Sequence, residues 1–110
     1  MIVEVVTGAD ERPEARVVDV DDLGRLHLAL GAVTDEEAAE ALERSGLGRL
    51  RDADTAVLDV AALRAAAEPR ASAENWSTRW DAMIGGARGK GWLSADGATL
   101  QVHVESAAGA

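Results

Sequence analysis

Four side chains near the C-terminus have the chemistry of a small binding site: Trp92, Gln101, His103 and Glu105. Glu105, a carboxylate two residues after His103, could tune the imidazole as a base or as a metal ligand. An aromatic ring and an amide beside this pair would add a stacking surface and a hydrogen-bonding group. We favour a simpler interpretation, a solvated sheet face onto which Trp92 folds, because pairs of polar residues are common on antiparallel sheets.

A predicted hairpin places these four side chains on one face. Residues 92–95 and 98–105 flank Asp96-Gly97, a dipeptide preferred in two-residue type I′ turns. In that register Leu93 lies opposite Leu100, and Trp92 lies opposite Gln101. The sequence therefore predicts an apolar hairpin face directed at the core and a polar face that carries the candidate binding residues.

A metal site is a weaker alternative. His27 in Leu-His-Leu and His103 in Val-His-Val each lie on the less apolar face of a predicted strand. If those strands were neighbours, the two histidines and Glu105 would supply three ligands. No short metal-binding spacing such as H-x-x-x-H supports this idea, and we favour two unrelated histidines. The glycine-rich segment 85–91 lacks the Walker A spacing, so we expect neither a metal nor a cofactor.

The elements that position these residues follow from periodicity and capping signals. Apolar alternation predicts strands at residues 2–6, 15–20, 25–30 and 55–58. Helices are predicted at residues 35–45, 60–68 and 73–89. The first of them begins with the capping box of Thr34 and Glu37 and ends at Gly46 in a left-handed cap. Asp59 and Ser72 are the expected N-caps of the other two.

The fold class predicted from these elements is α+β. The N-terminal strands and the C-terminal hairpin form an antiparallel sheet, and about three helices cover one of its faces. At 110 residues the whole chain, 1–110, is expected to be a single domain, with residues 106–110 as a frayed tail. The predicted core is built from large apolar side chains: Val18, Leu26, Leu28, Leu30, Leu42, Leu58, Leu63, Trp76, Trp80, Met83, Ile84, Leu100 and Val102.

Charge and composition restrict the classes of partner. Eleven Lys and Arg against twenty Asp and Glu give a net charge of -9, which disfavours nucleic acid and anionic membranes because phosphate binding requires positive charge. There is no cysteine, and no apolar run approaches the ~20 residues of a membrane span. We therefore expect a cytoplasmic protein.

The C-terminal third resembles small uncharacterised proteins of actinobacteria with high-GC genomes. The resemblance is carried by Trp76 with Arg79, by residues 81–84 and 90–92, and by His103-Val104-Glu105. It implies a bacterial, intracellular source and no particular activity. The chain's alanine, arginine and aspartate content agrees with such a source.

We therefore rank a protein-interaction or homodimeric accessory module first, with no enzymatic activity expected. In a homodimer, Trp92 would lie at the contact, and one of the segments 2–6 and 102–105 would form an open sheet edge. A small-molecule or metal-dependent enzyme using His103 and Glu105 is the second hypothesis. A winged-helix DNA-binding protein, suggested by three helices before a hairpin, is the third and is disfavoured by charge.

Overall fold

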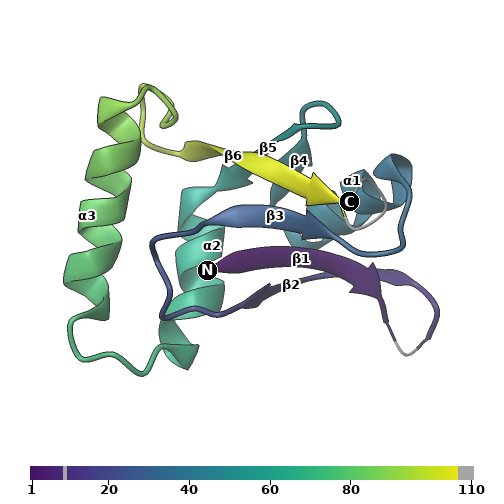
Figure 1. Ribbon diagram of the computed structural model, residues 1–110, viewed down its shortest axis with the longest axis horizontal. Helices are drawn as coiled ribbons and strands as arrows, with labels where there is room; N and C mark the ends of the chain where they lie inside the picture. The colour runs from purple at the N-terminus through teal and green to yellow at the C-terminus, as the bar shows by residue number, and fades with distance from the viewer. Residues whose placement is uncertain (9, 107–110) are drawn as a thin grey trace.

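The strands of the protein form one mixed sheet (Figure 1). The computed structural model describes residues 1–8 and 10–106. The strands are β1 (Ile2–Thr7), β2 (Pro13–Val18), β3 (His27–Leu30), β4 (Gly48–Leu50), β5 (Thr55–Asp59) and β6 (Thr99–Ser106). Their order across the six-stranded sheet is β2-β1-β3-β6-β5-β4.

The predicted α+β class is confirmed, but the sheet is not purely antiparallel. β1 pairs with β3 in parallel, and β3 pairs with β6 in parallel. The chain leaves β2, crosses to the far side of β1 and returns as β3, so β3 is the neighbour of a strand that runs in its own direction. Alternation of apolar residues reports which face of a strand is buried and does not report its neighbour, so the sequence could not reveal this pairing.

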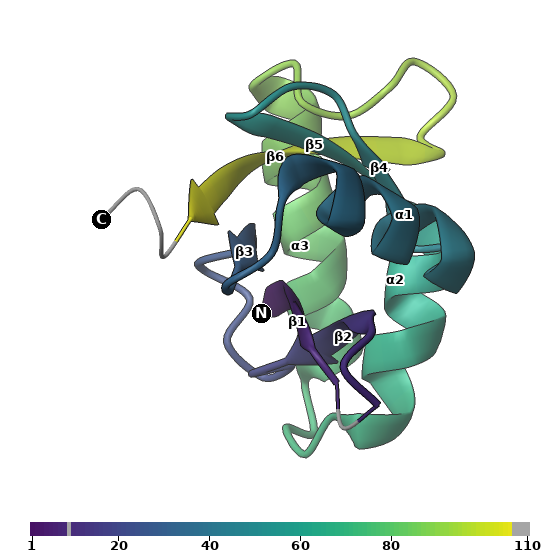
Figure 2. The ribbon, with the colours of Figure 1, turned by 90° about the vertical axis from the view of Figure 1, so that its right-hand side faces the viewer.

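The sheet curls around α1 (Asp35–Ser45) and α2 (Val60–Ala67), which lie on its concave side (Figure 2). The third helix is α3 (Trp76–Gly89), and a 3₁₀ turn, η1 (Glu68–Arg70), follows α2. α1 contacts both edge strands, β2 and β4, and α2 contacts β2 and β5. α3 stands at the end of the curled sheet where β3 and β6 begin (Figure 1). It therefore closes one end of the core and forms one side of the site described below.

Local capping fixes the ends of α1 as predicted. The Thr34 side chain accepts from the Glu37 amide, and the Glu37 carboxylate accepts in return from the Thr34 amide. At the other end, Gly46 is left-handed with a φ of 75°. The Leu47 amide donates to the Leu42 carbonyl, and both leucines are buried, which is the hydrogen bond and apolar contact of a Schellman motif.

The start of α3 differs from the prediction. The Asp59 carboxylate caps α2 as expected, accepting from the Ala62 amide at 2.8 Å. Ser72 was expected to cap α3 in the same way, but the helix begins at Trp76 and its N-cap is Asn75. The Ser72 amide instead donates to the Asp21 carboxylate at 2.9 Å, so this segment is tied to the loop between β2 and β3.

Two stacked tryptophans anchor α3 to the core. Trp76 and Trp80 are 3% and 2% exposed, and their ring centroids are 5.3 Å apart. The Trp76 indole N–H donates to the Val20 carbonyl at 2.6 Å, which satisfies the one polar atom of its buried ring. The prediction that Trp80 is a core residue is confirmed.

Most of the predicted core is buried, and four predicted core residues are not. Nine predicted core residues are buried: Leu28, Leu30, Leu42, Leu58, Leu63, Trp76, Trp80, Leu100 and Val102. Leu26, Met83 and Ile84 are partly buried, and the first two line a groove. Val18 is only half-buried, while Val17 is buried. The phase assigned to the second strand was therefore wrong by one residue, which moves every side chain to the other face.

The two strand segments proposed as open edges lie inside the sheet. β1 is flanked by β2 and β3, and β6 is flanked by β3 and β5. The true edges are β2 and β4. On β2, Arg44 donates to the Pro13 carbonyl and Arg70 donates to the Val17 carbonyl. Side chains from the helical layer therefore occupy the edge that a second copy would need for strand pairing.

Acid should weaken the link between the β2–β3 loop and the start of α3. The Ser72 and Ala73 amides donate to the Asp21 carboxylate, and these bonds hold the pKa of Asp21 below its usual value of 3.8. Because the folded-state pKa is the lower one, the stabilisation is complete above the unfolded pKa and is lost as pH falls through the folded pKa. In urea denaturation, Asp21→Asn should be destabilised relative to wild type at about pH 6, and this difference should shrink towards about pH 3.

Glu43→Gln, which alters an exposed carboxylate of α1, is the control. Its difference from wild type in the free energy of unfolding should not shrink between about pH 6 and about pH 3. A destabilisation by Asp21→Asn that stayed constant across this pH range would contradict the assignment.

Within the described part of the chain, no helix is long and apolar enough to cross a membrane. Of the predicted frayed tail, Ser106 is the last residue of β6, and residues 107–110 lie outside the described residues.

Candidate functional site

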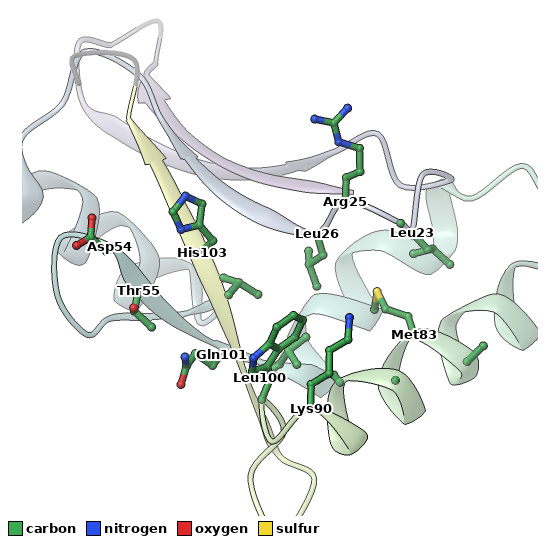
Figure 3. Close-up of a pocket in the computed structure, with 16 residues that line it drawn as sticks. Leu23, Arg25, Leu26, Asp54, Thr55, Met83, Lys90, Leu100, Gln101 and His103 are labelled. Carbon is green, nitrogen blue, oxygen red and sulfur yellow. The ribbon is translucent and has the colours of Figure 1, made fainter. Parts of the chain in front are cut away.

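An open groove of about 580 Å³ lies between α3 and β6 (Figure 3). Leu26 from the β2–β3 loop and Met83 from α3 extend into it from opposite sides (Figure 3). The remaining lining residues come from the loop before β3, the start of β5, α3 and β6: Leu23, Gly24, Arg25, Asp54, Thr55, Ala82, Gly86, Ala87, Lys90, Trp92, Leu100, Gln101, Val102 and His103. The groove thus has apolar side chains at its centre and polar groups at its rim, as binding clefts commonly do.

Trp92 is placed at the groove by the end of α3. Gly91, with a φ of 79°, turns the chain out of the helix at a conformation that other residues rarely adopt. The Trp92 amide then donates to the Ala87 carbonyl at 3.0 Å. The Lys90 ammonium lies 4.7 Å from the centroid of the indole ring, within cation–π range. Among the described residues, Trp92 is the one large apolar side chain that is exposed, at 46%.

The register of the predicted hairpin is confirmed, although its turn is different. Leu93 bridges Leu100, and the Gln101 amide donates to the Trp92 carbonyl at 2.8 Å. A type I′ turn at Asp96-Gly97 requires a positive φ at both residues, but only Gly97 has one, at 72°. The register survives because a longer loop that closes between Ser94 and Thr99 keeps the same residues opposite one another.

The Asp96 carboxylate holds this longer loop together. It accepts from the Ser94 hydroxyl at 2.6 Å and from the Ala98 amide at 3.0 Å. These hydrogen bonds favour the charged form and lower the pKa of Asp96 from 3.8. Asp96 therefore stabilises the loop through its side chain, and its backbone does not adopt the positive φ of the predicted type I′ turn.

Three of the four candidate binding residues line the groove, and the fourth is elsewhere. Trp92, Gln101 and His103 are lining residues, whereas Glu105 is not. Its carboxylate oxygen Oε2 lies 3.4 Å from Nε2 of His27. The structure therefore pairs Glu105 with His27 and not with its neighbour His103, and the pairing on which the enzyme hypothesis depended is not formed.

The three residues considered as metal ligands do not assemble as a cluster. His27 and His103 come one position before the paired residues Leu28 and Val104, so their strands are neighbours, as the metal hypothesis required. Over residues 1–8 and 10–106, however, no group of three or more His, Asp or Glu side chains comes together to hold a metal.

The structure brings to the groove cationic side chains that were not among the predicted site residues. Arg25 and Lys90 line the groove, and Arg51 donates from Nη1 to the Gln101 side-chain oxygen at 2.9 Å. Lys90 could have been found, because Lys-Gly-Trp places it two residues before Trp92. Arg51 follows β4, a three-residue strand that was not predicted, so its position beside Gln101 had no local signal.

Comparison of the chain with protein-family models, with curated proteins and with solved structures found no match.

Proposed function

We propose that this protein is an interaction module that binds another protein through the groove beside Trp92. The observation that carries the proposal is the position of Trp92, an exposed indole at the mouth of a groove with an apolar centre. Tryptophan is enriched among residues that dominate binding energy, and a large exposed aromatic ring beside a pocket is typical of such sites. A cytoplasmic location and the absence of a nucleic-acid partner remain part of this proposal, supported by the lack of cysteine and the net charge of -9.

A binding role fits the groove better than catalysis. His103 lies on the groove, but the carboxylate expected to orient it contacts His27. A general base normally needs a partner that fixes its tautomer and orientation. The residues that do converge on the groove are an indole, apolar side chains and cations, a composition typical of recognition surfaces.

Selection from a random displayed-peptide library tests the proposal. Wild-type protein should enrich a set of peptides that bind Trp92→Ala at least about tenfold more weakly, since hot-spot tryptophans contribute about 2 kcal/mol or more. Trp92→Phe is the matched variant and should retain part of the affinity. Far-UV circular dichroism and the unfolding midpoint of both variants should match wild type, because the side chain is exposed. If no peptide were enriched, or if enriched peptides bound Trp92→Ala equally well, the proposal would be wrong.

Self-association through Trp92 is the second candidate, favoured by the same exposed ring. Light scattering behind size exclusion at micromolar concentration distinguishes the two. A mass near 11.4 kDa, that of one chain, supports an interaction with a different protein. A mass of twice that value in wild type, reduced to one chain by Trp92→Glu, supports a homodimer.

A further inference from the structure

A second, shallower hollow adjoins the groove on the other side of Trp92. It has a volume of about 320 Å³, and it shares Trp92 and Gln101 with the groove. Its other lining residues come from β4, β5 and the hairpin: Arg49, Arg51, Val57, Gly91, Leu93, Ser94 and Thr99. A ligand that filled both hollows would have to pass over Trp92 and Gln101, so it would have to be elongated.

Positive charge is concentrated around these two hollows. Arg25 and Lys90 line the groove, and Arg49 and Arg51 line the second hollow. Among their described lining residues, Asp54 is the one carboxylate. This is the reverse of the whole chain, in which acids outnumber Lys and Arg by twenty to eleven. Within the described chain none of these four cations lies within 4 Å of a carboxylate, so their charges are not neutralised by a direct ion pair.

The main chain of β6 has an incompletely paired stretch beside the groove. The Gln101 amide donates to the Trp92 carbonyl, but the Trp92 amide donates to Ala87 and not back to Gln101. Pairing with β3 begins only at Val104. On the side of β6 away from β5, the backbone between Gln101 and Val104 therefore lies beside the groove, between the segment at Trp92 and β3.

We propose that the groove and the second hollow together bind an acidic, extended segment of a partner protein. This inference rests on the proposed function and specifies the chemistry of its ligand. Carboxylates of the segment pair with Lys90 at one end and with Arg49 and Arg51 at the other. An apolar side chain between them packs beside Trp92 on Leu26 and Met83. Opposite charges brought together at a binding surface select the partner and accelerate encounter.

The same charges argue against a symmetric dimer through this surface. A two-fold axis near Trp92 would place the patch against its own copy, so the cations of Arg25, Arg49, Arg51 and Lys90 would face one another. Like charges across an interface are unfavourable. An acidic partner avoids this repulsion.

Three ten-residue peptides that differ only in charge test the inference. Each has leucines at its centre, flanked by Glu in the first peptide, by Gln in the second and by Lys in the third. Binding is followed by two-dimensional NMR titration of the full chain. The Glu peptide should bind about tenfold more tightly than the Gln peptide, and the advantage should fall as salt rises from about 0.05 to 0.5 M, since exposed charges are screened. Resonances of Trp92, Gln101 and His103 should shift.

Charge-reversal variants locate the effect. Lys90→Glu and Arg49→Glu should each weaken the Glu peptide about fivefold, the upper value for one exposed ion pair, and should weaken the Gln peptide less than the Glu peptide. Arg12→Glu, an exposed arginine between β1 and β2, is the matched control and should have no effect.

The outcomes separate this inference from the proposed function. Equal binding of the Glu and Gln peptides, or preference for the Lys peptide, would overturn the acidic ligand while leaving an interaction module in place. Citrate binding as tightly as the Glu peptide would show that the site takes small anions and would overturn the peptide ligand. If none of the three peptides bound and the displayed library also yielded none, both proposals would fail.

Discussion

Replacing Trp80 by alanine should lower the free energy of unfolding by about 3 to 5 kcal/mol. Trp80 is 2% exposed, stacks on Trp76 at 5.3 Å, and lies in the stretch of α3 that closes the end of the curled sheet. Removing the ring loses its transfer free energy and leaves a cavity that a helix anchored by a second tryptophan cannot easily collapse. A small domain has a total stability of about 5 to 15 kcal/mol, so this loss is a large fraction of the total and should lower the unfolding midpoint clearly.

Trp92→Ala is the matched control, since it removes the same side chain from an exposed position. It should change stability by less than about 1 kcal/mol. Urea denaturation followed by far-UV circular dichroism measures both variants without relying on tryptophan fluorescence. Comparable losses in the two variants would mean that the exposed ring contributes to the core as much as the buried one.

Gly48→Ala should lower the free energy of unfolding by about 2 to 3 kcal/mol, in the upper part of the range for overpacking. A methyl group at position 48 would lie 2.2 Å from the Val57 carbonyl oxygen and 2.9 Å from the Leu58 Cα. Gly48 pairs with Leu58 at the edge of the sheet. The obstructing atoms are backbone atoms, so no rotamer change relieves the contact, and β4 must move away from β5.

Gly85→Ala is the control, because its expected change in stability has the opposite sign to that of Gly48→Ala. Gly85 lies in α3, and nothing comes within 4 Å of a methyl group added there. Alanine should raise stability by up to about 1 kcal/mol because it is the better helix former. Thermal unfolding of both variants gives the comparison, and a loss of stability in both would show that the close approach at Gly48 is not the cause.

Signals that span a few residues predicted their elements correctly. The capping box at Thr34, the cap at Gly46 and the N-cap at Asp59 are all present. The apolar stripe that contains Trp76 and Trp80 predicted the buried face of α3. Each depends on hydrogen bonds or side-chain spacing within a single element, which the chain specifies before any tertiary contact forms.

The candidate site could be predicted only in part. The predicted hairpin register and its alternation put Trp92, Gln101 and His103 on one face, and all three line the groove. The same alternation included Glu105, which the structure pairs with His27 from β3. Periodicity indicates that side chains share a face, but the partner of each depends on the neighbouring strand, and that neighbour lies far away in the sequence.

By itself, the sequence determined the existence of the helices, both caps of α1, the N-cap of α2, the hairpin register and the α+β class, because each of these depends on interactions among residues close together in the chain. Only the tertiary structure decided that the sheet is mixed, that β1 and β6 are interior strands, and that cations from separate elements line the two hollows that share Trp92. Lys90 follows α3 and Arg49 lies in β4, yet both line hollows that share Trp92, and no local preference relates them. Their proximity follows from the curl of the sheet and the docking of α3, which are set by burial of the whole core.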